Sequence, residues 1–183
     1  MTSLPAIALI ELTSIARGVV ASDAMAKTAP VKLLQSQTIC PGKYLIVVGG
    51  GEDPVREAFQ VGLHYAGQYL VDHLVIPNLH PQVLPALAAM QPLQKLESVG
   101  IIETFSAAAT VLAADAACKA AEITLIELRL GNGLGGKAYL TLSGEQFSVE
   151  AALSAGVDAI ASGLLLRSEL IPAPHQDMGR ALL

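Results

Sequence analysis

Hydrophobic and polar positions follow two patterns along the first half of the chain. Short apolar runs or strict alternation predict strands, and apolar residues at helical spacing predict helices. We expect the first helix to end before Pro30, and the second helix to begin at an Asp53 cap with Pro54 in its first turn. The predicted order is strand 6–12, helix 16–29, strand 31–38, strand 44–50, helix 53–70, strand 72–78 and then a short helix.

The second half of the chain repeats the first, and this repeat fixes the number of domains. Glu11 and Lys27 recur 92 positions later as Glu103 and Lys119. The separation grows to 94 at the turn between the two middle strands, and it is 95 where "IPNLH" recurs as "IPAPH" near the end. The register therefore holds throughout, and both halves are predicted to be complete copies of one unit.

Each copy is predicted to be a small domain of its own. Strands and helices mixed around a central hairpin favour an α+β fold, in which helices cover an antiparallel sheet. The proline-containing stretch "MQPLQKLE" at 90–97 is the expected linker. The predicted domains are residues 1–91 and residues 97–183.

Four segments of the second copy carry a resemblance to a known family. The segments "GIIET", "DAACKAAEITLI", "GLGGKAYLTLSG" and "IPAPH" resemble the bacterial microcompartment shell domain, in the order of its unpermuted members. That domain is related to the ferredoxin-like fold. More narrowly, the chain is similar to the tandem-domain members from propanediol-utilisation compartments, which carry a cysteine in the first-copy turn.

The resemblance implies a structural shell component in the bacterial cytoplasm rather than an enzyme. It implies a homotrimer whose six domains imitate a hexamer, and which packs edge to edge with other shell proteins. Duplication itself lowers the true symmetry of such a ring from six to three, because the two copies differ in sequence. Each first-copy turn would then occur three times around one axis.

The first-copy turn "ICPGK" contains the candidate site residues Ile39, Cys40, Pro41, Gly42 and Lys43. One cysteine cannot form a metal site, but three copies around a threefold axis can. The resemblance implies that Cys40 lies at a central pore and is the metal ligand of a 4Fe-4S cluster, one per trimer. Such a cluster would move electrons across the shell or serve an encapsulated redox enzyme.

Three other interpretations of Cys40 stay open at the level of sequence. Three thiolates could hold zinc or another soft metal. The chain could instead be a plain structural tile or small-molecule pore, in which Cys40 narrows the opening. A third possibility is a redox enzyme with a reactive thiol beside Lys43, although no resolving cysteine or general base lies near in sequence.

Other candidate positions favour structural roles. Leu134 replaces the cysteine in the second-copy turn "GNGLGGKAY", whose glycines match no phosphate-binding fingerprint. Cys118 lies in a helix of small residues and is expected to be an inert packing residue. His80 and His175 are repeat equivalents after a proline, and we expect capping or interface roles for both.

Two lysines mark a predicted assembly edge. Lys27 and Lys119 fall at the end of the equivalent helices, which in the family packs against a neighbouring assembly, although a cation there also favours the helix dipole. Family members add an arginine in a "PRPH" motif at this edge. Asn78 and Ala173 stand at those positions here.

Composition and charge narrow the choice of partners. The chain is 52% hydrophobic and only 15% charged, so apolar surface is expected to lie against other subunits. Its net charge of −5, without a basic cluster, argues against nucleic acid or an anionic membrane as a partner. Glu11 interrupts the first apolar run, which is therefore a poor signal peptide.

Overall fold

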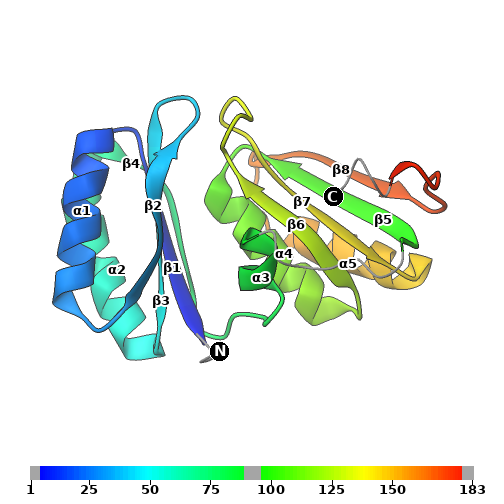
Figure 1. Ribbon diagram of the computed structural model, residues 1–183, viewed down its shortest axis with the longest axis horizontal. Helices are drawn as coiled ribbons and strands as arrows, with labels where there is room; N and C mark the ends of the chain where they lie inside the picture. The colour runs from blue at the N-terminus through cyan, green and yellow to red at the C-terminus, as the bar shows by residue number, and fades with distance from the viewer. Residues whose placement is uncertain (1–4, 89–95, 179–183) are drawn as a thin grey trace. The chain divides into compact units, whose positions relative to one another are not determined.

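The computed structural model describes residues 5–88 and 96–178 and divides into two compact units. The first unit runs to Leu79, and the second begins at His80, apart from the turn at 132–136. Each unit is a four-stranded antiparallel sheet with two long helices packed on it (Figure 1). The predicted α+β fold with two tandem copies is confirmed.

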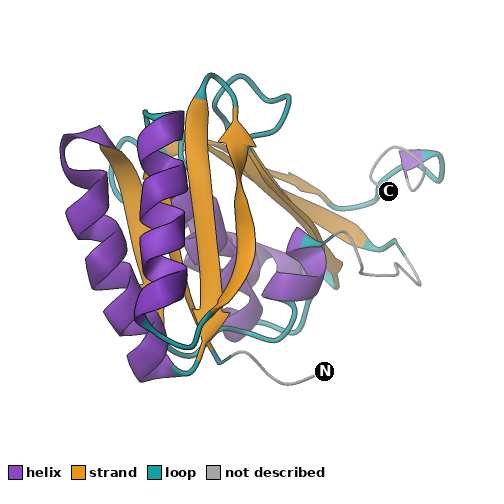
Figure 2. Cartoon of the chain, turned by 60° about the vertical axis from the view of Figure 1, so that its left-hand side comes forward, coloured by secondary structure: helices purple, strands orange, loops and turns teal. Residues whose placement is uncertain are grey.

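The first unit follows the predicted order of elements. Its sheet order is β2-β3-β1-β4, and both helices cover the same face of the sheet (Figure 2). The elements are β1 (Ala6–Leu12), α1 (Ile15–Thr28), β2 (Lys32–Ile39), β3 (Lys43–Gly50), α2 (Glu52–Ala66), the 3-10 turn η1 (Gly67–Tyr69) and β4 (Leu70–Ile76).

The second unit repeats this arrangement, with sheet order β6-β7-β5-β8. Even the irregularities recur, because a β-bulge follows Glu11 in the first sheet and Glu103 in the second. The elements are α3 (Val83–Leu87), β5 (Ser98–Thr104), α4 (Ala107–Ala120), β6 (Thr124–Leu130), β7 (Ala138–Gly144), α5 (Gln146–Asp158) and β8 (Leu165–Ile171). The helix α3, predicted to close the first repeat, packs against β6 and α4.

The helix starts follow local chemistry, with one correction. The Ser14 hydroxyl accepts from the Arg17 N–H at 3.3 Å at the start of α1, as its repeat equivalent does in α4. The predicted Asp53 cap is wrong, because α2 begins at Glu52 and its N-cap is Gly51. Glu52 and Asp53 both lie in the first turn, where their carboxylates interact favourably with the positive end of the helix dipole. The helix therefore starts before Asp53.

The core of the first unit lies between its sheet and its helices. Every residue of β1 is buried, and alternate residues such as Ala8 and Ile10 pack against Met25 of α1 and Phe59 of α2. Because successive strand residues point to opposite faces, this alternation turns one side of β1 to the helices. The predicted buried runs are therefore the centre of each sheet.

Gly62 lets α2 approach the sheet and α1 closely. A Cβ atom at this position would lie 2.4 Å from Ile10 Cδ1 and 2.6 Å from Met25 Sδ, which is inside van der Waals contact. We expect Gly62→Ala to lower the free energy of unfolding by about 2 kcal/mol, measured by urea titration. The control Gly51→Ala places its Cβ 3.5 Å from Pro54 Cδ, so it should cost no more than about 1 kcal/mol, from the loss of a favourable N-cap residue. Equal losses for the two variants would contradict this.

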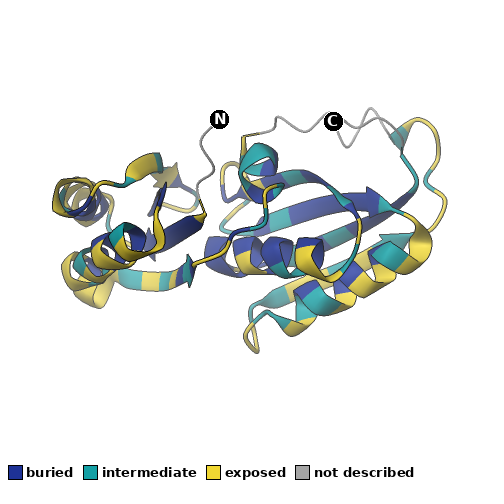
Figure 3. Ribbon diagram, turned by 90° about the horizontal axis from the view of Figure 1, so that it is seen from below, coloured by how far each residue is buried: buried dark blue, intermediate teal, exposed yellow. Residues whose placement is uncertain are grey.

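The two copies share a fold but differ in exposure (Figure 3). Ten of the fourteen residues of α4 are buried, whereas only four of the fourteen residues of α1 are buried. Val19 of α1 is 51% exposed, and its repeat equivalent Val111 is 1% exposed. Equivalent surfaces of the two units therefore have different environments.

Candidate functional site

The β2–β3 turn presents Cys40 at the tip of a hairpin. Ile39 pairs with Lys43, which leaves Cys40, Pro41 and Gly42 in the turn. The Gly42 N–H donates to the Ile39 carbonyl at 3.1 Å, and its φ of 84° is a left-handed conformation that favours glycine. Cys40 is half-buried with a free thiol, and Pro41 is exposed. The structure thus brings all five predicted turn residues together.

A buried ion pair holds the base of this turn. Lys43 Nζ contacts Glu11 Oε1, and the side chains are 16% and 1% exposed, respectively. Glu11 lies in β1, where it pairs with Leu45 of β3. A buried carboxylate is stable as an ion only with its partners in place, so this contact ties the hairpin to the central strands. Sequence reasoning matched these residues between copies but missed that they contact each other.

The second-copy turn has the same base and a different tip. Lys137 Nζ contacts Glu103 Oε1 at 2.5 Å, with side chains 43% and 31% exposed. Four glycines in this turn have positive φ, including Gly133 and Gly135 on either side of Leu134. The predicted difference in backbone is therefore present, and a strand follows the turn, as expected. Leu134 offers no ligand atom.

Cys118 is enclosed in α4 and has a different character from Cys40. Burial raises the pKa of its thiol to about 12, and the nearby Asp115 carboxylate adds to the effect. The thiolate is the nucleophile and metal ligand, so a thiol held protonated is unreactive. This environment supports the packing role expected for Cys118.

The two cysteines should differ in alkylation. At about pH 8 we expect iodoacetamide to modify Cys40 in the folded protein without cluster, and Cys118 only after unfolding, because its thiol is both enclosed and protonated. Mass spectrometry of peptides with and without urea measures both sites. Modification of Cys118 in the folded protein at a rate similar to that of Cys40 would contradict this.

The two predicted edge lysines occupy the last turns of equivalent helices. Lys27 Nζ lies 2.6 Å from Asp23 Oδ2 in α1, and Lys119 Nζ lies 2.5 Å from Asp115 Oδ2 in α4. Each cation also lies near the negative end of its helix, as expected. Their contact with a neighbouring assembly stays a prediction.

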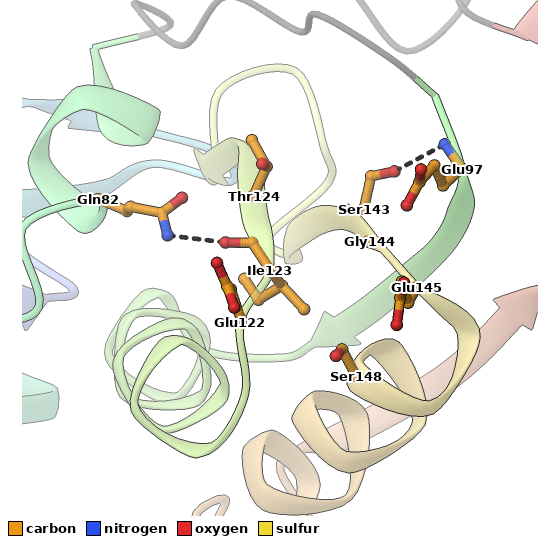
Figure 4. Close-up of a pocket in the computed structure, with 9 residues that line it drawn as sticks. All are labelled: Gln82, Glu97, Glu122, Ile123, Thr124, Ser143, Gly144, Glu145 and Ser148. Atoms are coloured by element: carbon orange, nitrogen blue, oxygen red, sulfur yellow. Dashed lines mark hydrogen bonds between the residues drawn. The ribbon is translucent and has the colours of Figure 1, made fainter.

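A polar pocket of about 560 Å³ lies in the second unit, away from the turns in sequence (Figure 4). Three glutamates line it, but no histidine or cysteine does. Across residues 5–88 and 96–178, no group of three His, Cys, Asp or Glu side chains is placed to hold a metal. The lining residues are Gln82, Glu97, Glu122, Ile123, Thr124, Ser143, Gly144, Glu145 and Ser148.

Comparisons with known proteins agree with the repeat and the fold. The BMC domain family matches residues 6–79 and again residues 98–174. The bacterial microcompartment shell protein PduT of Citrobacter freundii is 45% identical over 179 residues, which cover 97% of each chain. The chain belongs to the BMC domain family. It is a tandem-domain shell protein of the bacterial microcompartment.

Further relatives support the same assignment. The crystal structure of a microcompartments protein from Desulfitobacterium hafniense DCB matches with a TM-score of 0.89 and 43% identity, covering 97% of this shell protein and 99% of that chain. Carboxysome shell protein CcmK2 of Synechococcus elongatus is 36% identical over 85 residues, or 44% of this chain and 80% of that protein. PduT and CcmK2 are shell proteins, and this chain is likewise a structural component of a shell and not an enzyme.

The helices within residues 5–88 and 96–178 are all too short or too polar to cross a membrane. The predicted linker at 90–97 falls mostly outside the part of the chain that the structure describes. Residues 89–95 lie outside the described residues.

Proposed function

We propose that this shell protein forms a homotrimer in which three Cys40 thiolates hold one 4Fe-4S cluster, and that the tile carries electrons across the shell. The observation that carries the proposal is the β2–β3 turn, which presents a free, half-buried thiol at a hairpin tip. A ring of three chains repeats this turn three times, and Leu134 leaves the alternate turns without a thiol. Other shell proteins would pack at its edges.

The residues present fit such a group when three chains contribute. Soft thiolates are the ligands that iron–sulfur clusters take, and three of them leave one iron for a small external ligand. A single chain supplies one thiol at this turn, so the site needs the trimer to be complete. When bound, the cluster would supply one-electron redox chemistry.

The chain's own residues would position the thiol and set the charge around it. The Glu11–Lys43 pair fixes the first residue of β3, directly after the turn. Gly42 closes the turn in a conformation that other residues rarely adopt, so the direction of the Cys40 backbone is defined. The Lys43 cation is already compensated by Glu11, so the pair leaves no net charge beside the turn.

Anaerobic reconstitution with ferrous iron and sulfide tests this proposal. We expect about four irons and four sulfides per trimer, a brown colour with a broad visible band, and a paramagnetic signal that appears on reduction. Elemental analysis, absorption and electron paramagnetic resonance measure these properties. Protein that binds zinc but no iron, or that stays colourless and free of metal, would overturn the cluster and leave a plain tile or pore.

A further inference from the structure

The segment after β4 is held on the edge of the second sheet by its backbone. The His80 N–H donates to Asp115 Oδ1 at 2.8 Å, and Asp115 Oδ2 accepts from Lys119 at 2.5 Å. The chain then turns, with the Val83 N–H donating to the His80 carbonyl at 3.1 Å, and enters α3. The Asp115 carboxylate, in the second half of α4, thus receives this segment.

The Gln82 side chain completes the contact by bonding the edge strand twice. Its Nε2 donates to the Ile123 carbonyl at 2.8 Å (Figure 4), and its Oε1 accepts from the Leu125 N–H at 2.9 Å. β6 is an edge strand, so these backbone groups have no neighbouring strand on that side. Leu125 is fully buried. We call Asp115, Ile123, Thr124 and Leu125 the second-copy seat.

The first unit carries the same surface, and no segment among its described residues 5–79 occupies it. The repeat equivalents are Asp23, Val31, Lys32 and Leu33, which we call the first-copy seat. β2 is also an edge strand, and Asp23 is paired with Lys27 as Asp115 is with Lys119. Leu33 is 42% exposed, in contrast to the buried Leu125. The Asp23 side chain is 60% exposed, and that of Asp115 is 7% exposed.

The segment that contacts the second-copy seat, residues 80–83, recurs at residues 175–178 in the same conformation. The Asp177 N–H donates to His175 Nδ1 at 3.3 Å, just as the Gln82 N–H donates to His80 Nδ1 at 3.4 Å. The Met178 N–H donates to the His175 carbonyl at 2.9 Å, which matches the Val83 turn. Both histidines therefore cap their turns, as predicted. The side chains of His175 and Asp177 are 71% and 77% exposed.

We infer that residues 175–178 of one chain dock on the first-copy seat of a second copy of this chain. The inference rests on the trimer of the proposed function and assigns the residues of its joints. Within one chain, residues 80–83 contact the second-copy seat. Residues 175–178 would contact the first-copy seat of the next chain in the same way, and such a head-to-tail contact can close into a ring. The His175 N–H then donates to Asp23.

The contact between chains would include an ion pair at a position where the equivalent contact of residues 80–83 uses the Gln82 amide. Asp177 replaces Gln82, and Lys32 replaces Thr124. Gln82 and Thr124 line the same pocket (Figure 4), so both changes fall at one place. A carboxylate accepts hydrogen bonds but cannot donate to a carbonyl as Gln82 does. Lys32 makes no salt bridge within residues 5–88 and 96–178, and it supplies the cation that Asp177 needs.

Charge reversal at the two positions tests the joint. We expect Lys32→Asp and Asp177→Lys each to weaken trimer formation by about tenfold or more, because like charges then face each other, and the double variant to restore it. Sedimentation velocity over a protein concentration series measures the dissociation. Glu57→Lys on the exposed face of α2 is a control with the same charge change as Asp177→Lys and should leave the trimer intact.

The salt dependence of trimer stability distinguishes an ion pair from shape complementarity alone. Wild-type trimers should weaken between about 0.05 M and about 0.5 M salt, since screening acts on exposed charges. Asp177→Gln should keep the trimer and remove much of this salt dependence, because it restores the amide of the joint within a chain. A stable trimer that ignores both reversals would overturn the inference and leave the cluster proposal standing. A wild-type monomer at all concentrations would overturn the inference together with the trimer.

Discussion

Replacing Cys40 with serine is expected to reduce bound iron from about four atoms per trimer to almost none after anaerobic reconstitution. Serine keeps the size of the side chain, but its hydroxyl is a poor ligand for the soft iron–sulfur core. The turn itself should survive, because the Gly42 to Ile39 hydrogen bond and the Lys43 to Glu11 contact do not involve the thiol. Iron and sulfide analysis, with absorption spectra, measures the loss.

Cys118→Ala is the matched control for this experiment. Alanine already occupies the equivalent position of the first copy, at Ala26, so the fold tolerates it there. This variant should bind as much iron as the wild type. Iron retained by Cys40→Ser, or lost equally in both variants, would show that the β2–β3 turn is not the cluster ligand.

Lys43→Met is expected to destabilise the first unit by about 3 kcal/mol, because it removes the cation from a carboxylate that is almost wholly buried. The equivalent change Lys137→Met should cost about 1 kcal/mol or less, because Glu103 is 31% exposed and water can solvate its charge. Urea unfolding at one fixed protein concentration compares the two variants, since assembly also contributes to apparent stability.

A second substitution makes this comparison decisive. If the loss arises from the charge of Glu11, then Glu11→Gln combined with Lys43→Met should recover part of it, because a neutral amide costs less to bury than a carboxylate without its cation. Equal destabilisation by Lys43→Met and Lys137→Met, with no recovery in the double variant, would contradict the role given to the buried pair.

The order of elements and the two copies could be predicted from sequence because their signals are local. The alternation of a strand and the Pro-Gly pair of a turn can each be recognised within a few neighbouring residues. The repeat then transfers each assignment from one copy to the other. The β-bulges after Glu11 and Glu103 show how closely the copies agree. The start of α2 was misplaced at Asp53 because several residues there favour a first turn, and pattern alone does not choose among them.

The contacts that position the site were not predictable in the same way. Lys43 and Glu11 are 32 residues apart and meet only because β3 lies beside β1. Gln82 and Leu125 are 43 residues apart and meet only because α3 packs on β6. A signal for the first contact was present, since a glutamate inside an apolar strand recurs in both copies together with a lysine. That coincidence indicates a buried carboxylate with a cationic partner.

The ion pair at the base of both hairpins has a consequence for protein engineering. The two copies keep the same lysine and glutamate but attach turns that differ in length, glycine content and ligand atoms. The same base therefore supports turns of different length and sequence while the register of the sheet is kept. Foreign turns grafted between Ile39 and Lys43 can carry other ligand atoms, and the duplication allows the turn of one copy to be redesigned while the turn of the other copy stays unchanged.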